Sequence, residues 1–249
     1  MLKEERLDII LKELNKKKKI RFEDLAIRLH VSEDTVRRDI DILHRNGLLS
    51  KARGGAILRE KDPLTFHDRT SFLTKEKDII ALKTQQFLKN GMTVFMDGGT
   101  TVCAVVAHMP LDITLRIITN NYSVVPIAEK FNHVELILLG GTYERDLAVT
   151  SGLTTCYEAS KYIADAFIMG TCAINPEFGV TSVSLTDGET KKVMVQSSKK
   201  TIALASRNKL HQSEAFKVCE TDRISTLITD LSSDDPELDP FRKSGIRII

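Results

Sequence analysis

The chain of 249 residues is 42% hydrophobic and 28% charged, which allows one large domain or two ordinary ones and excludes a disordered or fibrous protein. No apolar stretch approaches the roughly 20 residues that span a bilayer, and residues 1–19 are charged throughout, unlike a signal peptide, so we expect a cytoplasmic protein with no membrane partner. The net charge of +2 is unevenly distributed, because residues 1–58 hold 14 Lys and Arg against 10 Asp and Glu, a net +4 that favours an anionic partner.

Three helices are predicted at the start of the chain. Apolar residues at helical spacing predict a helix over residues 2–14, and the polar run 15–19 predicts a loop or turn. A shorter helix fits residues 22–29, and a tight break follows it at His30. A third helix is predicted over residues 33–45.

The outward face of the third predicted helix is suited to DNA. Ser32 can cap this helix. The three predicted helices form a helix-turn-helix, in which two short helices are joined by a turn and a third supports them. The last helix of such a motif can enter the major groove of DNA. Removing the inward apolar stripe leaves the candidate DNA-contacting residues Ser32, Thr35, Arg37 and Arg38. In an alternative interpretation, the two arginines only form ion pairs with acidic residues one helical turn away. Residues 48–58 then predict a β-hairpin wing whose Lys51 and Arg53 face phosphate.

The motifs of this segment occur together in one known family. Residues 31–43 read V-S-E-D-T-V-R-R-D-I-D-I-L, and residues 53–56 read R-G-G-A. In this combination the segment resembles the DeoR family of bacterial repressors, which implies that Ser32, Thr35, Arg37 and Arg38 belong to the DNA-contacting helix. Residues 59–73 predict a linker, so we expect a winged helix-turn-helix DNA-binding domain over residues 1–58 and a second domain over residues 74–249.

Strands and helices alternate through the second domain. After a helix over residues 74–89, apolar strands end in Gly, Asn, Thr or Asp and give way to helices, which is typical of a parallel α/β sheet. Strands are predicted over residues 93–96, 115–119, 134–139, 166–170, 179–181, 201–205, 226–229 and 245–249. The helices between them are predicted over residues 102–108, 123–131 and 187–198. We expect a sheet of at least six strands, with ligands bound outside the carboxyl ends of the strands.

The candidate anion site is the segment D-G-G-T-T that follows the first of these strands. Asp97 begins it, Gly98 and Gly99 let the backbone approach a ligand, and Thr100 and Thr101 add hydroxyl donors to the N–H groups of the next helix. A phosphate suits such a site. Neither a Walker loop nor a GxGxxG motif is present, which disfavours nucleotide hydrolysis and dinucleotide binding. The alternative is a tight strand-to-helix turn that holds no ligand.

The second domain also resembles the DeoR family. The strings that carry this resemblance are, in order, F-M-D-G-G-T-T, I-T-N-N, L-L-G-G, D-A-F-I-M-G, G-V-T-S, E-T-K-K and T-L-I-T-D. The resemblance implies a fold similar to ribose-phosphate isomerase and glucosamine-phosphate deaminase, and a sugar-phosphate effector. The pocket that it implies contains Asp97, Gly98, Gly99, Thr100, Thr101, Asn120, Gly140, Gly170, Glu189, Lys191 and Lys209. Residues 206–209 read S-R-N-K where relatives tend to have D-S-S-K, and Ala173 stands where they tend to have a glycine, so the ligand can differ.

We therefore expect a repressor that binds the double-stranded DNA operator of a carbohydrate-utilisation operon. A phosphorylated sugar is expected to control the affinity of the repressor for DNA, and the repressor is expected to be a homodimer or tetramer. The alternatives are a protein-interaction module and a sugar-phosphate isomerase or deaminase that carries a DNA-binding domain, with Asp97 and Glu189 as acid and base. We expect no catalytic residue and no cofactor. We also expect no metal, because the cysteines lie far apart and form no CxxC or zinc-finger pattern. The four cysteines are Cys103, Cys156, Cys172 and Cys219.

Overall fold

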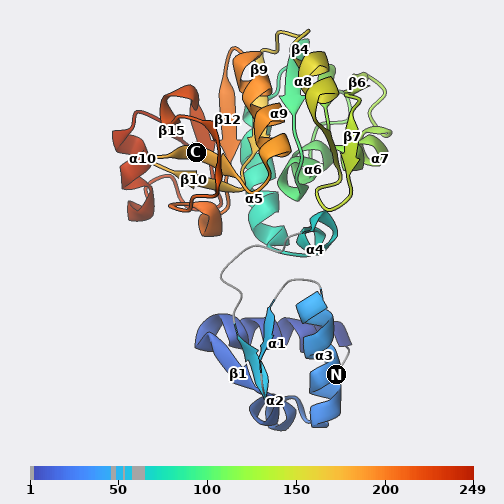
Figure 1. Cartoon of the computed structure of the whole chain (residues 1–249), viewed down its shortest axis with the longest axis vertical. Helices are drawn as coiled ribbons and strands as arrows, with labels where there is room; N and C mark the ends of the chain where they lie inside the picture. Colours follow the sequence, from blue (N-terminus) through green and yellow to red (C-terminus); the bar gives the residue numbers. More distant parts are fainter. Residues whose placement is uncertain (1–2, 46–48, 53, 58–64) are drawn as a thin grey trace. The chain divides into compact units, whose positions relative to one another are not determined.

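The chain is organised as two compact units, Met1–Phe72 and Leu73–Ile249. The computed structural model describes residues 3–45, 49–52, 54–57 and 65–249 (Figure 1). The predicted linker over residues 59–73 falls partly outside the described residues, and within its described part Phe66–Thr70 forms helix α4. Across the described ranges, no helix combines the length and the apolar character that crossing a bilayer requires.

The first unit contains three helices and a small antiparallel sheet with strand order β1-β3-β2. Its elements are α1 (Lys3–Lys17), β1 (Lys19–Arg21), α2 (Phe22–Leu29), α3 (Glu33–Arg45), β2 (Ser50–Ala52) and β3 (Gly55–Ile57). The predicted second and third helices are confirmed at both ends. The left-handed conformation of His30 (φ 53°) ends α2, and Ser32 Oγ accepts a hydrogen bond from the backbone N–H of Thr35 (3.3 Å) at the start of α3.

The prediction of a loop over residues 15–19 was wrong, because α1 continues to Lys17 and β1 begins at Lys19. A helix end needs no apolar side chain. The ammonium of Lys17 lies 3.2 Å from a carboxylate oxygen of Glu13 one turn earlier, and basic side chains at a helix C-terminus interact favourably with its dipole. Lys18 then adopts φ 63° and ends the helix. The wing predicted over residues 48–58 is confirmed in its described part, where β2 and β3 pair antiparallel.

The second unit is built on a seven-stranded sheet with order β15-β14-β12-β9-β4-β5-β6, in which every neighbouring pair is parallel. Its strands are β4 (Met92–Met96), β5 (Leu115–Thr119), β6 (Val134–Leu138), β9 (Ala166–Gly170), β12 (Thr201–Leu204), β14 (Thr226–Ile228) and β15 (Arg247–Ile248). The helices are α5 (Thr74–Thr84), α6 (Thr100–Ala107), α7 (Val125–Ala128), α8 (Leu153–Ala159), α9 (Leu185–Gln196) and α10 (Asp239–Lys243). The predicted parallel α/β sheet is therefore confirmed.

Both faces of this sheet are buried. Successive residues of a strand face opposite sides, so Val94 and Met96 of β4 pack in one core with α5, α6 and α7, whereas Phe95 packs in another core with α8, α9 and α10. Burial on both faces explains why the strands read as continuous apolar runs. Figure 1 shows helices on either side of the strands.

Two predicted elements of this unit differ in the structure. Gly179–Ser182 (β11) lies outside the main sheet, in an antiparallel sheet with β10 (Ala173–Asn175) and β13 (Phe216–Cys219). The connection from β10 to β11 is a short hairpin loop, and a loop of this length can join antiparallel strands but not parallel ones. The helix predicted over residues 123–131 is shortened to a 3-10 turn followed by the four residues of α7.

The strand order places a topological switch point between β4 and β9. After β4, the chain adds β5 and β6 on one side, and it then returns to add β9, β12, β14 and β15 on the other. Connections on the two sides of such a point diverge and leave a crevice at the carboxyl ends of the two central strands, where open α/β sheets bind ligands. A second hairpin, β7 (Thr142–Glu144) and β8 (Val149–Ser151), extends from this edge.

Candidate functional site

The outward face of α3 carries two exposed arginines. Arg37 lies 3.4 Å from a carboxylate oxygen of Glu33 one turn earlier, and its guanidinium lies 5.5 Å from the centre of the Phe22 ring. Arg38 is also exposed. An ion pair between exposed side chains contributes little free energy, so the Glu33 pairing that the alternative interpretation expects leaves Arg37 able to exchange this partner for phosphate. Ser32 and Thr35 face each other at the start of the helix, with their hydroxyl oxygens 3.0 Å apart.

The wing supplies further positive charge. Lys51 of β2 pairs with Asp41 of α3, and Arg53, the other predicted wing contact, lies outside the described residues. Sequence reasoning considered Lys19 only as the end of the polar run 15–19 and did not single out Arg21. The two residues alternate on β1 around buried Ile20 and are both exposed. These two residues line a groove of about 400 Å³ together with the glycines of the wing. A basic residue on either side of one buried residue is the pattern that could have identified this edge.

The predicted anion segment lies at the switch point of the second unit. Asp97 directly follows β4 and is fully buried, and its Oδ1 accepts a hydrogen bond from the backbone N–H of Gly170 at the end of β9 (2.7 Å). A Cβ atom at residue 170 would come within 2.8 Å of the carbonyl oxygen of Gly98, so only glycine allows this approach. The structure therefore brings together Asp97, Gly98 and Gly170 from the two central strands.

The next residues form the first turn of α6. Gly99 precedes the helix with φ 115°, and a Cβ atom placed there would meet nothing within 4 Å, so the space beside it is open. Thr100 and Thr101 begin the helix and are 9% and 7% exposed. The N–H groups of a first helical turn have no partner within the helix, and the predicted anion site depends on this feature.

Neighbouring loops cover this turn. Asn121 donates from its side-chain amide to the carbonyl oxygens of Asp97 (3.2 Å) and Gly99 (3.4 Å). The adjacent Asn120, 1% exposed, donates to the carbonyl oxygen of Thr150 in β8 (2.7 Å), and its Oδ1 accepts no hydrogen bond from any described residue. A buried acceptor without a donor costs about 1–3 kcal/mol, so Asn120 is suited to accept a hydrogen bond from a ligand.

A buried ion cluster connects Asp97 to α9. The ammonium of Lys191, 4% exposed, lies 3.0 Å from Asp97 Oδ2 and 2.6 Å from Asp187 Oδ1. Burial raises the pKa of Asp97 to about 6 and outweighs the Lys191 ammonium, which acts in the opposite direction. Burial also acts to lower the pKa of Lys191, but the carboxylates of Asp187 and Asp97 together outweigh it and the pKa is raised. Asp187 was not among the predicted residues, although its spacing of four residues from Lys191 on a helix could have identified it.

Three other predicted residues have partners other than Asp97. Glu189 is exposed and pairs with Lys192 (3.7 Å), so the structure does not bring it to Asp97. Gly140 donates its N–H to Glu158 Oε2 (2.7 Å). Lys209 donates to the carbonyl oxygen of Thr171 (2.7 Å), just beyond the end of β9.

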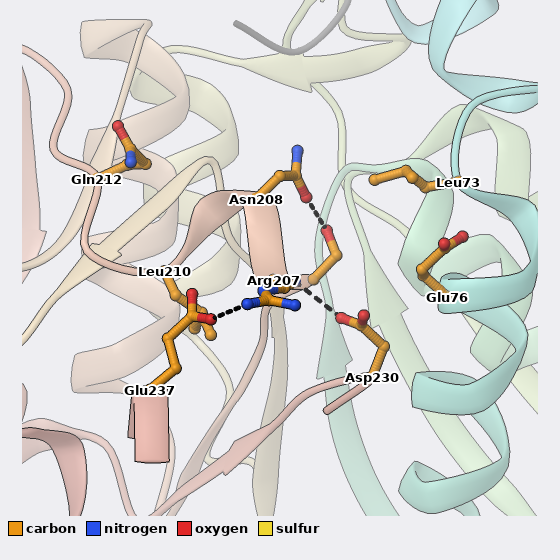
Figure 2. A pocket seen from close by; sticks show the side chains of 9 residues that line it. Leu73, Glu76, Arg207, Asn208, Leu210, Gln212, Asp230 and Glu237 are labelled. Carbon is orange, nitrogen blue, oxygen red and sulfur yellow. Dashed lines mark hydrogen bonds and ion pairs between the residues drawn. The ribbon is translucent and has the colours of Figure 1, made fainter. Parts of the chain in front are cut away.

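The turn that carries Lys209 also borders a separate pocket of about 420 Å³. Figure 2 shows Arg207 at its centre, 2.8 Å from Glu237 Oε2 and bonded through its backbone N–H to Asp230 Oδ1 (2.8 Å). Glu76 of α5 adds a third carboxylate to the lining. Three carboxylates and one guanidinium that is already paired line this pocket, so it suits an anion less well than the first turn of α6 does.

The raised pKa of Asp97 predicts a pH dependence of stability. Its value of about 6 in the folded chain exceeds the value of about 3.9 for an unfolded carboxyl group, so the folded state binds this proton more tightly. The contribution of Asp97 to the free energy of unfolding is therefore expected to fall between about pH 4 and pH 6 and to change no further above that. In Asp97→Asn this slope should be absent, which urea denaturation at several pH values measures. Asp112→Asn, at an exposed loop position, is the control, and an identical slope in wild type and Asp97→Asn would contradict the prediction.

Models of two protein domains match this chain. The DeoR C terminal sensor domain matches residues 73–231, and the DeoR-like helix-turn-helix domain matches residues 6–62.

Several curated proteins are similar over most of the chain. The HTH-type transcriptional repressor GlcR of Bacillus subtilis is 31% identical over 100% of this chain and 96% of its own. The putative aga operon transcriptional repressor of Escherichia coli O157:H7 is 25% identical over 98% of this chain and 93% of its own. The glycerol-3-phosphate regulon repressor of Escherichia coli K12 is 28% identical over 84% and 83%. Among solved structures, ribose 5-phosphate isomerase A of Methanocaldococcus jannaschii is similar over 54% of this chain and 53% of its own, with a TM-score of 0.40 and 14% identity.

Proposed function

The chain belongs to the DeoR family, and on this basis we propose that it is a transcriptional repressor that binds operator DNA and is controlled by a phosphorylated sugar. Relatives of nearly equal length are named as repressors of the aga operon and the glycerol-3-phosphate regulon, which supports a carbohydrate-utilisation operon as the target. We place the DNA contacts at the exposed face of α3 and on the wing. The observation that carries the ligand site is the open space beside Gly99, directly before α6 at the switch point of a parallel sheet.

Regulation requires the sugar phosphate to bind the DNA-competent and DNA-incompetent states with different affinities, because equal affinity shifts no equilibrium. The direct experiment measures fluorescence anisotropy of DNA from upstream of the chain's own gene, with and without each member of a panel of sugar phosphates and the corresponding free sugars. A phosphorylated sugar that changes the affinity, while its free counterpart does not, supports the proposal. Failure to bind this DNA and the upstream regions of sugar operons would contradict it.

The enzymatic alternative has little support in the arrangement of the site. Its candidate acid and base are Asp97 and Glu189. Asp97 is paired with Lys191, whereas Glu189 is exposed and paired with Lys192. The relatives are named as transcriptional regulators. We therefore propose a regulator without catalytic activity, acting in the cytoplasm, and steady turnover of any sugar phosphate by the purified chain would overturn this.

We further propose that the chain acts as a homodimer or tetramer. One helix-turn-helix per chain contacts one half-site, and pairing two chains lets two recognition helices reach successive turns of the major groove. Sedimentation of the protein with an operator duplex measures the number of chains per DNA, and a single bound chain would contradict the proposal.

The threonines of α6 provide a test of the ligand site. Replacing both Thr100 and Thr101 by valine keeps their volume and removes two hydroxyl donors, each worth about 1.5–3 kcal/mol in a hydrogen bond to a charged group. The affinity for the sugar phosphate is expected to fall by roughly a hundredfold or more, whereas operator binding without ligand is expected to be unchanged. Isothermal titration calorimetry measures the first quantity and anisotropy the second. Thr154→Val, at an exposed position of α8, is the matched control, and unchanged affinity in the double variant would remove α6 from the site.

A further inference from the structure

The ion cluster around Lys191 has an excess of negative charge. One ammonium lies between two carboxylates, those of Asp97 and Asp187, and all three side chains are less than one-tenth exposed. The cluster therefore carries a net charge of −1 when both carboxyl groups are ionised. Charges act over longer distances in a buried site than in water, so a phosphate that approaches Lys191 meets net repulsion rather than a free cation.

Asp187 is held in this position independently of any ligand. Its Oδ2 accepts a hydrogen bond from Ser182 Oγ (2.9 Å), and its backbone N–H donates to Ser184 Oγ (3.3 Å), which caps α9. A carboxylate in the first turn of a helix is also stabilised by the helix dipole. The pairing with Lys191 is therefore a fixed property of the site.

The side of the sheet that faces α9 offers groups for hydroxyls. Met96 and Thr119 are register partners on neighbouring parallel strands, so Asp97 and Asn120 follow them at the same level. The buried Oδ1 of Asn120 needs a donor, which a sugar hydroxyl has and a fully ionised phosphate lacks. Asp97 can accept from a hydroxyl as well, and Lys191 can donate to one.

The other side of the sheet offers positive potential. Helix α6 packs on the opposite face from α9, and its first turn is open beside Gly99. Lys77, 8% exposed, adds a cation on this face, since its helix α5 packs in the same core as α6. Burial raises the pKa of the Cys103 thiol in α6 to about 11, and the charge of Lys77 acts in the opposite direction. The two faces of the carboxyl edge thus differ in charge.

We propose that Asp187 fixes the orientation of the effector: by pairing with Lys191 it keeps phosphate away from α9, so the sugar hydroxyls lie against Asp97, Asn120 and Lys191 and the phosphate lies at the first turn of α6. This proposal rests on the proposed function for the class of effector. Asp187 acts through Lys191 and is a specificity-determining residue rather than a direct phosphate ligand.

Inorganic phosphate is the probe that tests this orientation, titrated into the full chain by calorimetry. Replacing Thr100 and Thr101 by valine is expected to weaken phosphate binding about a hundredfold in the wild-type background. Adding Asp187→Asn to this double variant makes the cluster neutral and frees Lys191 from one carboxylate, so phosphate affinity is expected to recover by at least about tenfold. A gain of binding cannot come from misfolding, which would weaken it further.

Two controls complete the experiment. Asp239→Asn removes an exposed carboxylate from the first turn of another helix, α10, and should give no recovery, and Asp187→Glu keeps the charge and should give none either. The proposal is overturned if the valine substitutions leave phosphate binding unchanged, or if Asp187→Asn restores no more binding than Asp239→Asn does.

A measurement on the wild-type chain covers the case in which Asp187→Asn does not fold. A crystal structure with saturating inorganic phosphate is expected to show phosphate bonded to the N–H groups of Thr100 and Thr101. Phosphate bonded to Lys191, or none at α6, would overturn the orientation. Operator binding, measured separately, distinguishes a failure of the repressor function from a failure of this assignment, since the phosphate position is decided whether or not DNA binds.

Discussion

Replacing both Arg37 and Arg38 by glutamate is expected to weaken operator binding by at least about a thousandfold. The two side chains are the exposed cations on the outward face of α3 that the structure describes, and the substitutions change the charge of each chain by four units. Phosphate contacts dominate affinity for DNA, and an arginine at a base edge adds specificity. The glutamate introduced in place of Arg37 would also stand one turn from Glu33, which adds repulsion within the helix. Fluorescence anisotropy at fixed salt measures the loss.

The same variant should fold and bind ligand as the wild type does, because neither arginine contributes to the core of the first unit. Circular dichroism and calorimetry with the sugar phosphate check this. Lys161→Glu, an exposed charge reversal in the second unit, is the matched control and should leave operator affinity within about threefold. Unchanged operator affinity in the arginine variant would show that another surface contacts DNA.

Lys191→Met is expected to lower the free energy of unfolding by about 3–5 kcal/mol at pH 8, because it leaves the buried carboxylates of Asp97 and Asp187 without their cation. Methionine is close to lysine in length, so little of this loss comes from packing. Urea denaturation monitored by circular dichroism measures it. Lys192→Met, at the neighbouring exposed position of α9, should change stability by less than about 0.5 kcal/mol.

The loss of stability caused by Lys191→Met should become smaller as the pH falls. Without the ammonium, nothing offsets the burial that already raises the pKa of Asp97, so the penalty for its buried charge is present above that raised pKa and is relieved as Asp97 is protonated at lower pH. The quantity to follow is the difference between variant and wild type, since other groups titrate in both. Equal stability of the two proteins at pH 8 would mean that the ammonium does not hold the carboxylates in the native state.

The ends of a helix or strand could be predicted closely where the residues that determine them lie within the element itself or next to it. Helices α2 and α3 match their predicted ends because His30, Ser32 and the apolar stripe are all local features, and β5 matches because its residues are buried on both faces. The α6 turn was found for the same reason, since D-G-G-T-T contains the whole feature in five adjacent residues. Such elements are specified within one segment.

The features that sequence reasoning missed depend on pairing between distant segments. The strand β10, whose short hairpin with β11 excludes a parallel pairing, was not predicted, and the other partner of β11, β13, is far along the chain. The β7 and β8 hairpin, which covers Asn120, was not expected either. The resemblance placed Lys191 and Glu189 in one pocket. Residues that are two positions apart on a helix point in different directions, and here only Lys191 turns inward.

The order of the strands has a consequence for the chain while it is still being made. The first unit is complete once residue 72 has been synthesised, whereas the proposed ligand site needs β9 and α9, which emerge from the ribosome much later. Domains generally fold as units, with the N-terminal one first. A nascent or prematurely terminated polypeptide would thus possess its helix-turn-helix unit before the parallel sheet is complete, and nonsense alleles ending upstream of Ala166 would encode fragments that lack the proposed effector site.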